Sequence, residues 1–190
     1  GAKGTFEPVL DLLFEEPAST LWRASLDALG YRRLGPSLLA CALAEDKLRQ
    51  RQFVAGLGLQ QPRWCRLQDW VPDPAGGTWV AKRRRSSQSR HVHLVYPGTS
   101  TLDAMVDGQP EDWIIERYVG GDEFHVGIVT SRAGSITVLP VARIPSASEP
   151  WLLDERRKNT PQEIPLEFVY GDDAFVMQLV VASQELVRAF

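Results

Sequence analysis

Hydrophobic residues in the first third of the chain recur every three or four positions, which is the spacing of an amphipathic helix. This spacing predicts helices over residues 6–14, 20–29 and 37–55. Gly30 and Gly56 stand at the ends of the second and third segments, where a glycine commonly terminates a helix. The third segment also carries four charged residues that we expect on its solvent-exposed side: Asp46, Lys47, Arg49 and Arg51.

From Gln61 onward the pattern changes to short apolar runs separated by proline and glycine, which is typical of strands and turns. Strands are predicted at residues 63–67, 78–82, 91–95, 113–118, 123–130, 135–141 and 166–170. A polar, proline-containing loop over 145–165 is long enough to suggest a functional role, and a helix is predicted over 172–190. Helices followed by a strand-rich middle and a final helix predict the α+β class with mostly antiparallel sheets.

Composition narrows the class of protein. With 190 residues, 44% hydrophobic and 24% charged, the chain is expected to fold as one large domain or two small ones. The 21 basic and 24 acidic residues give a net charge of -3, which argues against a surface devoted to nucleic acid or anionic membrane. No apolar run approaches the roughly 20 residues that cross a bilayer. Two separated cysteines without a CxxC pair favour a reducing, cytoplasmic setting.

A basic segment follows the strand predicted at 78–82. Lys82 ends that strand, and arginines and three serines follow in the turn at 83–90. Ammonium, guanidinium and hydroxyl groups together suit the binding of phosphate. A solvated basic hairpin explains the segment equally simply and is favoured when the segment is taken alone. An RNA-binding hairpin is a third interpretation, although few aromatic residues are present for base stacking.

Two further groups of residues have simpler explanations than catalysis. His91 and His93 alternate along one strand and His125 lies elsewhere, but no nearby cysteine or carboxylate completes a zinc-binding spacing. Solvent-facing or hydrogen-bonded histidines are therefore favoured. Cys41 falls on the apolar side of its predicted helix and is interpreted as a small core residue.

The segment from Trp113 to Ile128 carries the most information. An apolar strand ends in Glu116-Arg117-Tyr118-Val119, turns through two glycines, and continues into a strand that begins with Glu123. An acid after such a turn can accept two hydroxyl hydrogens from a sugar, and the backbone before the turn can pair with the edge of an adenine. A plain β-hairpin with both glutamates exposed accounts for the pattern with about equal weight.

These residues resemble the adenine- and ribose-binding segment of the D-alanine–D-alanine ligase family, within the ATP-grasp superfamily. Further segments resemble that family in the same order along the chain: residues 30–47 ending in Asp46-Lys47, 57–62, 79–82, the serine turn, 139–141 and 154–158. The resemblance implies an α+β, ATP-grasp-like fold. It divides the chain into residues 1–35 at the end of an N-terminal substrate domain, 36–115 as a central subdomain, and 116–190 as part of a C-terminal subdomain.

The resemblance also implies roles for individual residues. Lys47 and Lys82 would contact the phosphates of ATP, and Lys158 would reach the γ-phosphate from a mobile loop. Ser86 or Ser87 would lie in the loop that covers the phosphates, with Ser87 assigned to catalysis. Glu123 would hold the ribose. The adenine hinge would consist of Glu116, Arg117, Tyr118 and Val119.

The activity that the resemblance implies is ATP-dependent ligation of a carboxylate to an amine through an acyl phosphate. The implied setting is peptidoglycan precursor synthesis in the cytoplasm, with amino-acid substrates and no nucleic-acid or membrane partner, and it allows a homodimer. The family's magnesium ligands would follow Phe190 and its first domain would precede Gly1. The chain therefore resembles a fragment, and turnover by these residues alone is not expected. The alternative is a non-catalytic nucleotide-binding or protein-interaction module derived from the ATP-grasp fold, because the family's metal ligands are not present and Arg83 and the residues 84–89 replace a glycine and a proline of its phosphate loop.

Overall fold

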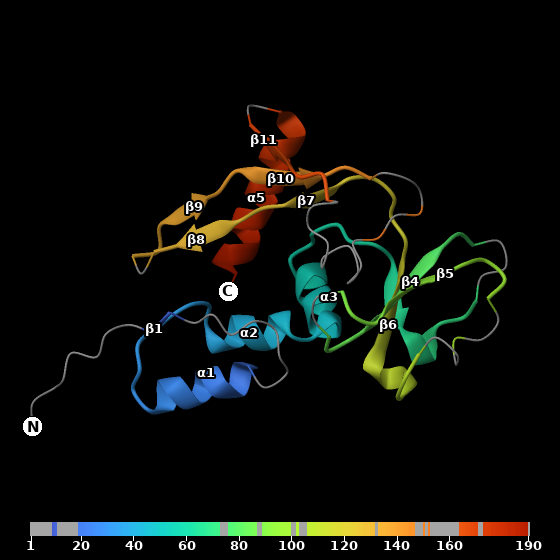
Figure 1. The fold of residues 1–190 in the computed structure, drawn as a ribbon, viewed down its shortest axis with the longest axis horizontal. Helices are drawn as coiled ribbons and strands as arrows, with labels where there is room; N and C mark the ends of the chain where they lie inside the picture. The colour runs from blue at the N-terminus through green and yellow to red at the C-terminus, as the bar shows by residue number, and fades with distance from the viewer. Residues whose placement is uncertain are drawn as a thin grey trace, which may run out of the picture.

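The computed structural model describes residues 9–10, 19–72, 76–86, 89–99, 102, 106–131, 133–146, 150, 152, 164–170 and 173–189. Helices α1, α2 and α3 lie in the N-terminal third, α5 lies near the C-terminus, and the two larger sheets have four and three strands (Figure 1). Both larger sheets are antiparallel throughout. The α+β class predicted from the sequence is confirmed.

The N-terminal region begins with a short strand rather than the helix predicted over residues 6–14. β1, Val9–Leu10, pairs in parallel with β2, Arg33–Leu34. The helix prediction is wrong at these two residues, because backbone pairing with a distant strand outweighed a weak helical pattern; the rest of 6–14 lies outside the described residues. Helix α1 follows at Ser19–Ala28, close to its predicted position.

The long helix predicted over residues 37–55 is in fact two helices. α2 spans Leu38–Ala44 and α3 spans Lys47–Gly56. Asp46 separates them in an extended conformation, with φ -119° and ψ 104°, and its carboxylate accepts a hydrogen bond of 3.0 Å from the amide of Leu48. An aspartate in this position caps a new helix rather than continuing an old one.

The four-stranded sheet has the order β3, Trp64–Arg66; β6, Trp113–Arg117; β4, Trp79–Arg83; β5, Val92–Val95. These strands confirm the predictions at 63–67, 78–82, 91–95 and 113–118. Short 3-10 helices, η1 at Leu67–Asp69 and η2 at Pro110–Asp112, flank it. One face of the sheet carries the main hydrophobic core: Leu67, Trp79, Ala81, Val95, Leu102, Trp113 and Ile115.

The alternation of side chains along each strand directs other residues to the opposite face. Ala81 is paired with Ile115 in the core, so the next residues, Lys82 and Glu116, project from the other side. Arg51 of α3 contacts Glu116 there, which places α3 over this face. A charged cluster therefore lies between the sheet and α3.

The second sheet has the order β11, Glu167–Val169; β10, Val141–Ile144; β7, Glu123–His125. Helix α5, Ala174–Arg188, packs on it through Phe175, whose ring centroid lies 5.1 Å from that of Phe124. The predicted strand at 166–170 and the predicted helix at 172–190 are confirmed with shorter bounds.

The strands predicted at 123–130 and 135–141 are each interrupted. β8, Ile128–Thr130, pairs with β9, Ile136–Val138, and forms the outer end of a hairpin whose inner end is β7 with β10. The break falls at Gly127, whose carbonyl accepts a 2.8 Å hydrogen bond from the amide of Leu139, next to Pro140. A proline cannot donate to a ladder, which explains why pairing stops there.

None of the helices in the described residues combines the length and the hydrophobicity needed to cross a membrane.

Candidate functional site

A buried carboxylate with two basic partners lies between the four-stranded sheet and α3. Glu116 on β6 is 4% exposed and forms ion pairs with Lys82 of β4 and Arg51 of α3. Lys82 and Arg51 are both only a quarter exposed at their side chains. A carboxylate removed from water requires such partners, because an unpaired buried charge costs several kcal/mol. The cluster thus joins two residues that the sequence predicted to bind a nucleotide.

A second pair of predicted residues meets at the start of α3. Lys47 donates through Nζ to the carbonyl oxygen of Ser86 at 2.6 Å and to its hydroxyl at 3.2 Å. The backbone amide of Lys47 also donates to the carbonyl of Arg84 at 3.1 Å. The turn that follows β4 is therefore attached to the first residue of α3 by both backbone and side chain.

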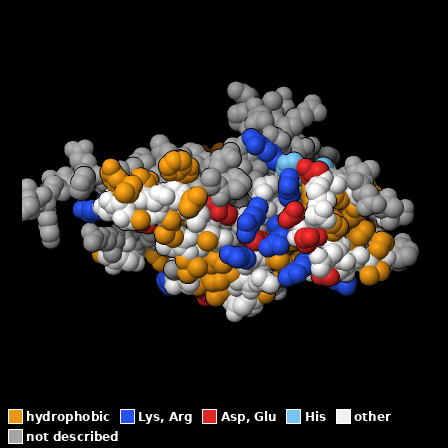
Figure 2. All heavy atoms as spheres, turned by 90° about the horizontal axis from the view of Figure 1, so that it is seen from below, with side chains coloured by type: hydrophobic (Ala, Val, Ile, Leu, Met, Phe, Trp, Pro, Cys, Tyr) orange, Lys and Arg blue, Asp and Glu red, His pale blue; other side chains and the backbone are white. Residues whose placement is uncertain are grey.

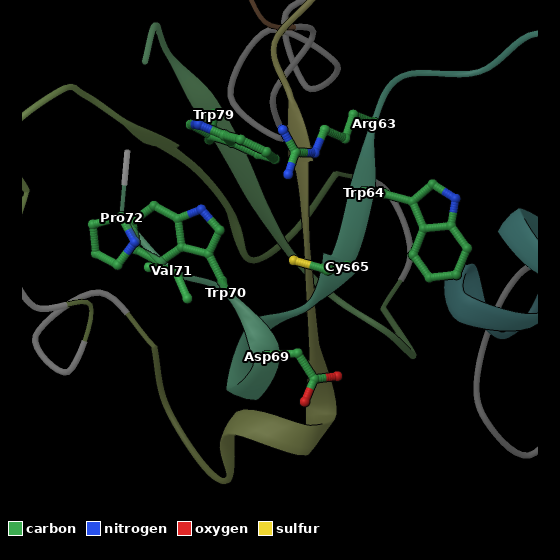
Figure 3. A pocket seen from close by; sticks show the side chains of 8 residues that line it. All are labelled: Arg63, Trp64, Cys65, Asp69, Trp70, Val71, Pro72 and Trp79. Atoms are coloured by element: carbon green, nitrogen blue, oxygen red, sulfur yellow. The ribbon is translucent and has the colours of Figure 1, made fainter. Parts of the chain in front are cut away.

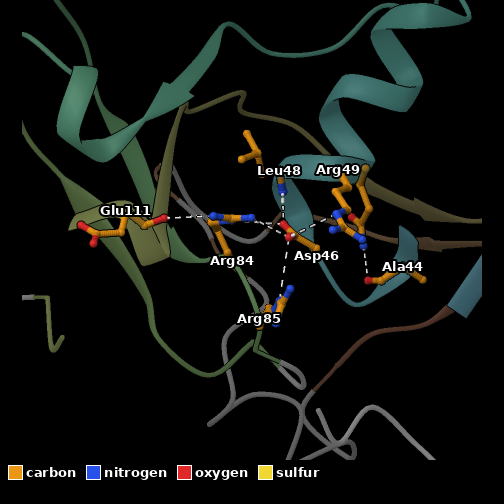
Figure 4. A network of polar contacts seen from close by, with 8 residues as sticks. Ala44, Asp46, Leu48, Arg49, Arg84, Arg85 and Glu111 are labelled. Atoms are coloured by element: carbon orange, nitrogen blue, oxygen red, sulfur yellow. Dashed lines mark hydrogen bonds and ion pairs between the residues drawn. The ribbon is translucent and has the colours of Figure 1, made fainter. Parts of the chain in front are cut away.

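Beside the contact between Lys47 and Ser86, the side chains of three arginines point toward the carboxylate of Asp46 (Figure 4). Arg84 approaches its carboxylate with two nitrogens, Nη2 at 2.7 Å and Nε at 3.2 Å, whereas Arg49 and Arg85 stand at 3.9 Å. Asp46 is 1% exposed. Burial alone would raise its pKa, but the hydrogen bonds and positive charge of Arg84, with the amides of Leu48 and Arg49, hold the pKa of Asp46 below its ordinary value. The same pairing raises the pKa of Arg84.

The side chain of Ser86 connects the two sides of the turn after β4. The hydroxyl of Ser86 lies 3.1 Å from the carbonyl oxygen of Arg83 and 3.2 Å from that of Arg90. Ser89 and His91 adopt left-handed backbone conformations, with φ of 57° and 53°. Ser87, the predicted catalytic residue, and Lys158, predicted to reach the γ-phosphate, lie outside the described residues.

The four predicted hinge residues share a stretch of backbone, but their side chains separate. Glu116 faces Lys82, whereas the guanidinium of Arg117 lies on the other face, 5.9 Å from the ring centroid of Trp79. The amides of Arg117 and Tyr118 already donate to the carbonyls of residues 63 and 78, at 2.8 and 3.0 Å. Val119 is 67% exposed, and within the described part of the chain its amide donates no hydrogen bond. Of these amides, the one at Val119 is the donor that a ligand could use.

Glu123 begins β7, beyond the glycine turn. Its side chain is 44% exposed, and its carboxylate lies 3.7 Å from Nε2 of His125. The preceding Asp122 is held by the amide of Ser146 at 2.9 Å and by Arg143 at 2.7 Å, and these hydrogen bonds lower its pKa. No contact among the described residues joins Glu123 to the Lys82 cluster, so a cleft shared by the two stays a prediction.

Three members of these clusters were not identified from the sequence. Asp46 and Arg51 were expected on the solvent-exposed side of a single helix, and the structure corrects both: Asp46 is buried and Arg51 is paired with Glu116. Arg84 was treated only as part of a basic turn. One available signal was the spacing of Lys47 and Arg51, which at four residues places both on one face of a helix.

Much of the basic charge near the turn is paired. In a view from below, lysine and arginine side chains form a band with acidic side chains among them (Figure 2). Arg83 lies 3.4 Å from Asp107, and Arg84 is bound by Asp46. His91 and His93 instead contact the ring of Trp113, with centroids 6.3 and 5.7 Å apart. Paired arginines offer less charge to a nucleic-acid backbone than a solvated basic hairpin would.

A cavity of about 460 Å³ lies at the β3 edge of the sheet and contains none of the predicted site residues. Figure 3 shows Trp70, Trp79 and the thiol of Cys65 around it, with the ring of Trp64 turned away. Burial and the negative charge of Asp69 raise the pKa of Cys65, with Arg63 opposing them. Cys41 is buried at 4% exposed, which confirms its interpretation as a core residue.

The curated proteins to which this chain is similar in sequence include D-alanine–D-alanine ligases. No protein-family model matches the chain. A D-alanine–D-alanine ligase of Cereibacter sphaeroides is 28% identical over 107 residues, which cover 53% of this chain and 34% of that protein. One from Idiomarina loihiensis is 25% identical over 138 residues, covering 67% and 43%. The matched region thus spans less than half the length of these curated relatives.

Solved structures extend the similarity over nearly the whole chain. A D-alanine–D-alanine ligase from Bacillus anthracis aligns with 92% of this chain and 56% of its own, at a TM-score of 0.65 and 19% identity. D-alanyl-alanine synthetase A from Vibrio cholerae aligns with 96% and 59%, at 0.68 and 12% identity. N5-carboxyaminoimidazole ribonucleotide synthetase from Thermus thermophilus aligns with 96% and 47%, at 0.64 and 17% identity. The predicted resemblance is confirmed: the chain is similar in sequence to D-alanine–D-alanine ligases and has the α+β fold of the ATP-grasp ligases.

Proposed function

We propose that this chain is the nucleotide-binding part of an ATP-dependent ligase that joins a carboxylate to an amine, as D-alanine–D-alanine ligases do. The observation that carries the proposal is the meeting of residues far apart in sequence: Lys47 contacts Ser86, and Lys82 contacts Glu116. All four are residues for which the family resemblance implies a nucleotide contact. The subdomain boundaries after residues 35 and 115 remain part of the proposal.

The phosphate end of the nucleotide would be bound by Lys47, Lys82 and the turn that carries Ser86. A triphosphate carries several negative charges and needs more than one cation. Glu116 has a second basic partner in Arg51. The ammonium group of Lys82 can therefore move from Glu116 to a phosphate oxygen. The buried carboxylate of Glu116 then still has one positive partner, Arg51.

The adenosine end would lie against the segment that leads from β6 to β7. The unengaged amide of Val119 is suited to an acceptor on the adenine edge. The partly exposed carboxylate of Glu123 is suited to the two ribose hydroxyls, because a carboxylate accepts two hydrogen bonds without supplying a competing donor. This arrangement supports an adenine nucleotide over a plain hairpin.

In the proposed reaction, a substrate carboxylate oxygen attacks the γ-phosphorus, and ADP leaves with the electrons of the broken P–O bond. The amine of a second substrate then attacks the acyl carbon, loses a proton, and displaces inorganic phosphate. Phosphorylation is needed because a carboxylate is a poor electrophile. The residues described here would supply positioning and charge stabilisation, which dominate phosphoryl transfer.

Substrates, metal and setting follow only from the resemblance. The proposal extends to amino-acid substrates, magnesium and peptidoglycan precursor synthesis in the cytoplasm. Within the described residues, no three histidine, cysteine or acidic side chains gather so as to hold a metal ion.

The decisive experiment is calorimetric titration of the 190-residue chain with ATP. Lys82→Ala and Glu123→Ala should each weaken binding about tenfold or more, the equivalent of one charge-assisted hydrogen bond. Arg66→Gln, at an exposed residue of β3, is the matched control and should bind as the wild type does. Unchanged affinity in both test variants would remove the proposed pocket.

A second measurement separates an enzyme from the non-catalytic alternative. The full-length gene product should release phosphate from ATP when amino acids are added. Tight ATP binding with no phosphate release under any such condition would favour a nucleotide-binding module built on the same fold.

A further inference from the structure

We propose that Asp46 and Arg84 form a clasp that positions the Ser86 turn, so that affinity for the phosphates of a nucleotide depends on two side chains outside the predicted contact set. The term clasp refers to the side-chain contact between Asp46 and Arg84. The inference rests on the proposed function for its nucleotide part. Its structural part, the fixing of the turn, stands on the contacts alone.

Arg84 is held through its backbone as well as its side chain. Its amide donates to the carbonyl of Asp112 at 2.8 Å, and its own carbonyl accepts from the amide of Lys47 at 3.1 Å. Its guanidinium reaches Asp46 with two nitrogens and the carbonyl oxygen of Glu111 at 3.3 Å. A single residue thus connects the end of β4, the start of α3 and the helical turn η2.

Asp46 is the fixed end of the clasp. It is almost completely buried, and its carboxylate also caps α3 through the amide of Leu48, so its position is set by the helix. The neighbouring Arg49 and Arg85 do not share this geometry. Both stand at 3.9 Å with side chains 54% and 65% exposed, whereas Arg84 is 25% exposed and lies at 2.7 Å. Two-point contact by a planar guanidinium fixes direction as well as distance.

The consequence falls on Ser86 and Lys47. Ser86 follows Arg84 by two residues, and its carbonyl and hydroxyl both contact the ammonium of Lys47. Loss of the contact between the Arg84 side chain and Asp46 would leave only the backbone hydrogen bonds of Arg84, so the turn should loosen and its support of Lys47 should weaken. Val119 and Glu123, at the proposed adenosine end, have no contact with Asp46 or Arg84 among the described residues. Loss of the clasp should therefore weaken recognition of phosphates and leave recognition of adenosine unchanged.

The clasp also explains how residues 84–86 are held in place without the residues that the family resemblance implies. The resemblance implies a glycine and a proline in the phosphate loop, and Arg83 and residues 84–89 stand there instead. Proline restricts the backbone directly. Here a buried ion pair restricts the same segment from outside it.

The test uses Asp46→Asn, Arg84→Gln and Arg84→Lys in the 190-residue chain. Asparagine still caps a helix, so Asp46→Asn preserves the start of α3. Lysine keeps the charge of Arg84 but loses the two-point contact. Arg49→Gln is the control, because it removes an exposed arginine at 3.9 Å from the same carboxylate. Two quantities are measured: hydrogen exchange of the amides of residues 83–86 and 89–91, and the affinities for ATP and adenosine.

We expect exchange of the amides of residues 83–86 and 89–91 to accelerate about tenfold in Asp46→Asn and Arg84→Gln, with a smaller change in Arg84→Lys and none in Arg49→Gln. ATP affinity should fall about tenfold while adenosine affinity stays within about twofold. The double variant should be no worse than either single one, because both remove the same contact.

Unchanged exchange in Asp46→Asn and Arg84→Gln would overturn the clasp. An equal loss of ATP and adenosine affinity would overturn its specific effect on phosphates and indicate general destabilisation. If the wild-type chain binds no ATP, the proposed function fails, and the exchange measurement still decides whether the clasp holds the turn.

Discussion

The carboxylate of Glu116 on β6 is shared by Lys82 of the adjacent strand and Arg51 of the helix above it. The two strands place these residues diagonally, since Glu116 lies opposite Val80 and Lys82 lies opposite Ile114. One acid therefore holds two cations against a face of the sheet. In the proposed function this arrangement would keep basic groups in place for a polyanion, and removal of the acid should lower the stability of the fold.

Glu116→Gln should destabilise the chain by about 2 kcal/mol. Loss of one partner of a buried ion pair typically costs about 3–5 kcal/mol, and a lower figure is expected here because both cations keep some contact with water. The measurement is urea unfolding at neutral pH. Glu111→Gln, which alters an exposed side chain, should change the free energy of unfolding by less than about 0.5 kcal/mol. Equal changes in the free energy of unfolding in the two variants would show that the ion pairs of Glu116 do not stabilise the fold.

The ion pair of Asp46 should make stability depend on pH in the acidic range. The pKa of Asp46 in the folded chain lies below its ordinary value, so the folded state binds this proton less readily than the unfolded state does. Its contribution is therefore complete above about pH 4 and is lost as the pH falls through the folded pKa. The difference in unfolding free energy between the wild type and Asp46→Asn should be constant from pH 7 to pH 5 and should narrow below about pH 4.

Urea unfolding at several pH values from pH 7 into the acidic range provides the check, with Asp69→Asn as the comparison at an exposed acid. A difference between the wild type and Asp46→Asn that stays constant across the acidic range would show that the ion pair does not contribute in this way.

The fold was predicted well where one local pattern dominates. The strands around Ala81 and Ile115 are bounded by turns and each begin with a run of three apolar residues, so their positions were correct. Errors arose where a distant partner decides the structure. Val9 and Leu10 are extended because Arg33 and Leu34 are available for pairing, and the helix predicted through Asp46 breaks where the carboxylate caps α3 and meets Arg84. Such partners are 24 and 38 residues away and leave no local signal.

In the candidate site too, residues within recognisable local segments were predicted, and residues that depend on a distant partner were not. Lys47, Lys82 and Glu116 were predicted as site residues because the family resemblance covers short segments around each, and the structure places each in one of the two contact clusters. Arg51 and Arg84 were missed as individual residues, because a charged residue in a helix or turn is predicted to be solvent-exposed unless its partner is known. Their partners, Glu116 and Asp46, come from other elements. The pairing therefore depends on the packing of α3 against the sheet, which sequence patterns do not supply.

Cys65 should react slowly with alkylating reagents. Burial and the nearby charge of Asp69 raise the pKa of its thiol, so less thiolate is present at pH 8 than in an unperturbed cysteine. Asp69→Asn should speed alkylation by iodoacetamide, and Arg63→Gln should slow it, because the positive charge of Arg63 opposes the shift. Mass spectrometry of the modified peptide gives the rate. Identical rates in both variants would contradict this account, and Cys41, which is buried, should react only on unfolding.

Glu123 should discriminate between nucleotides by their ribose hydroxyls. Its carboxylate is partly exposed at the start of β7 and is proposed to accept hydrogen bonds from both hydroxyls. Glu123→Gln should weaken ATP binding about tenfold, since a hydrogen bond to a charged acceptor is worth roughly 1.5–3 kcal/mol. The same substitution should change the affinity for 2′,3′-dideoxy-ATP by less than about twofold, because that nucleotide has no hydroxyl to lose. His125→Gln, at the residue 3.7 Å from Glu123, is the control for altered local charge and should affect both nucleotides alike. Equal losses for ATP and its dideoxy analogue in Glu123→Gln would mean that this carboxylate acts through the overall charge of the site and does not hold the sugar.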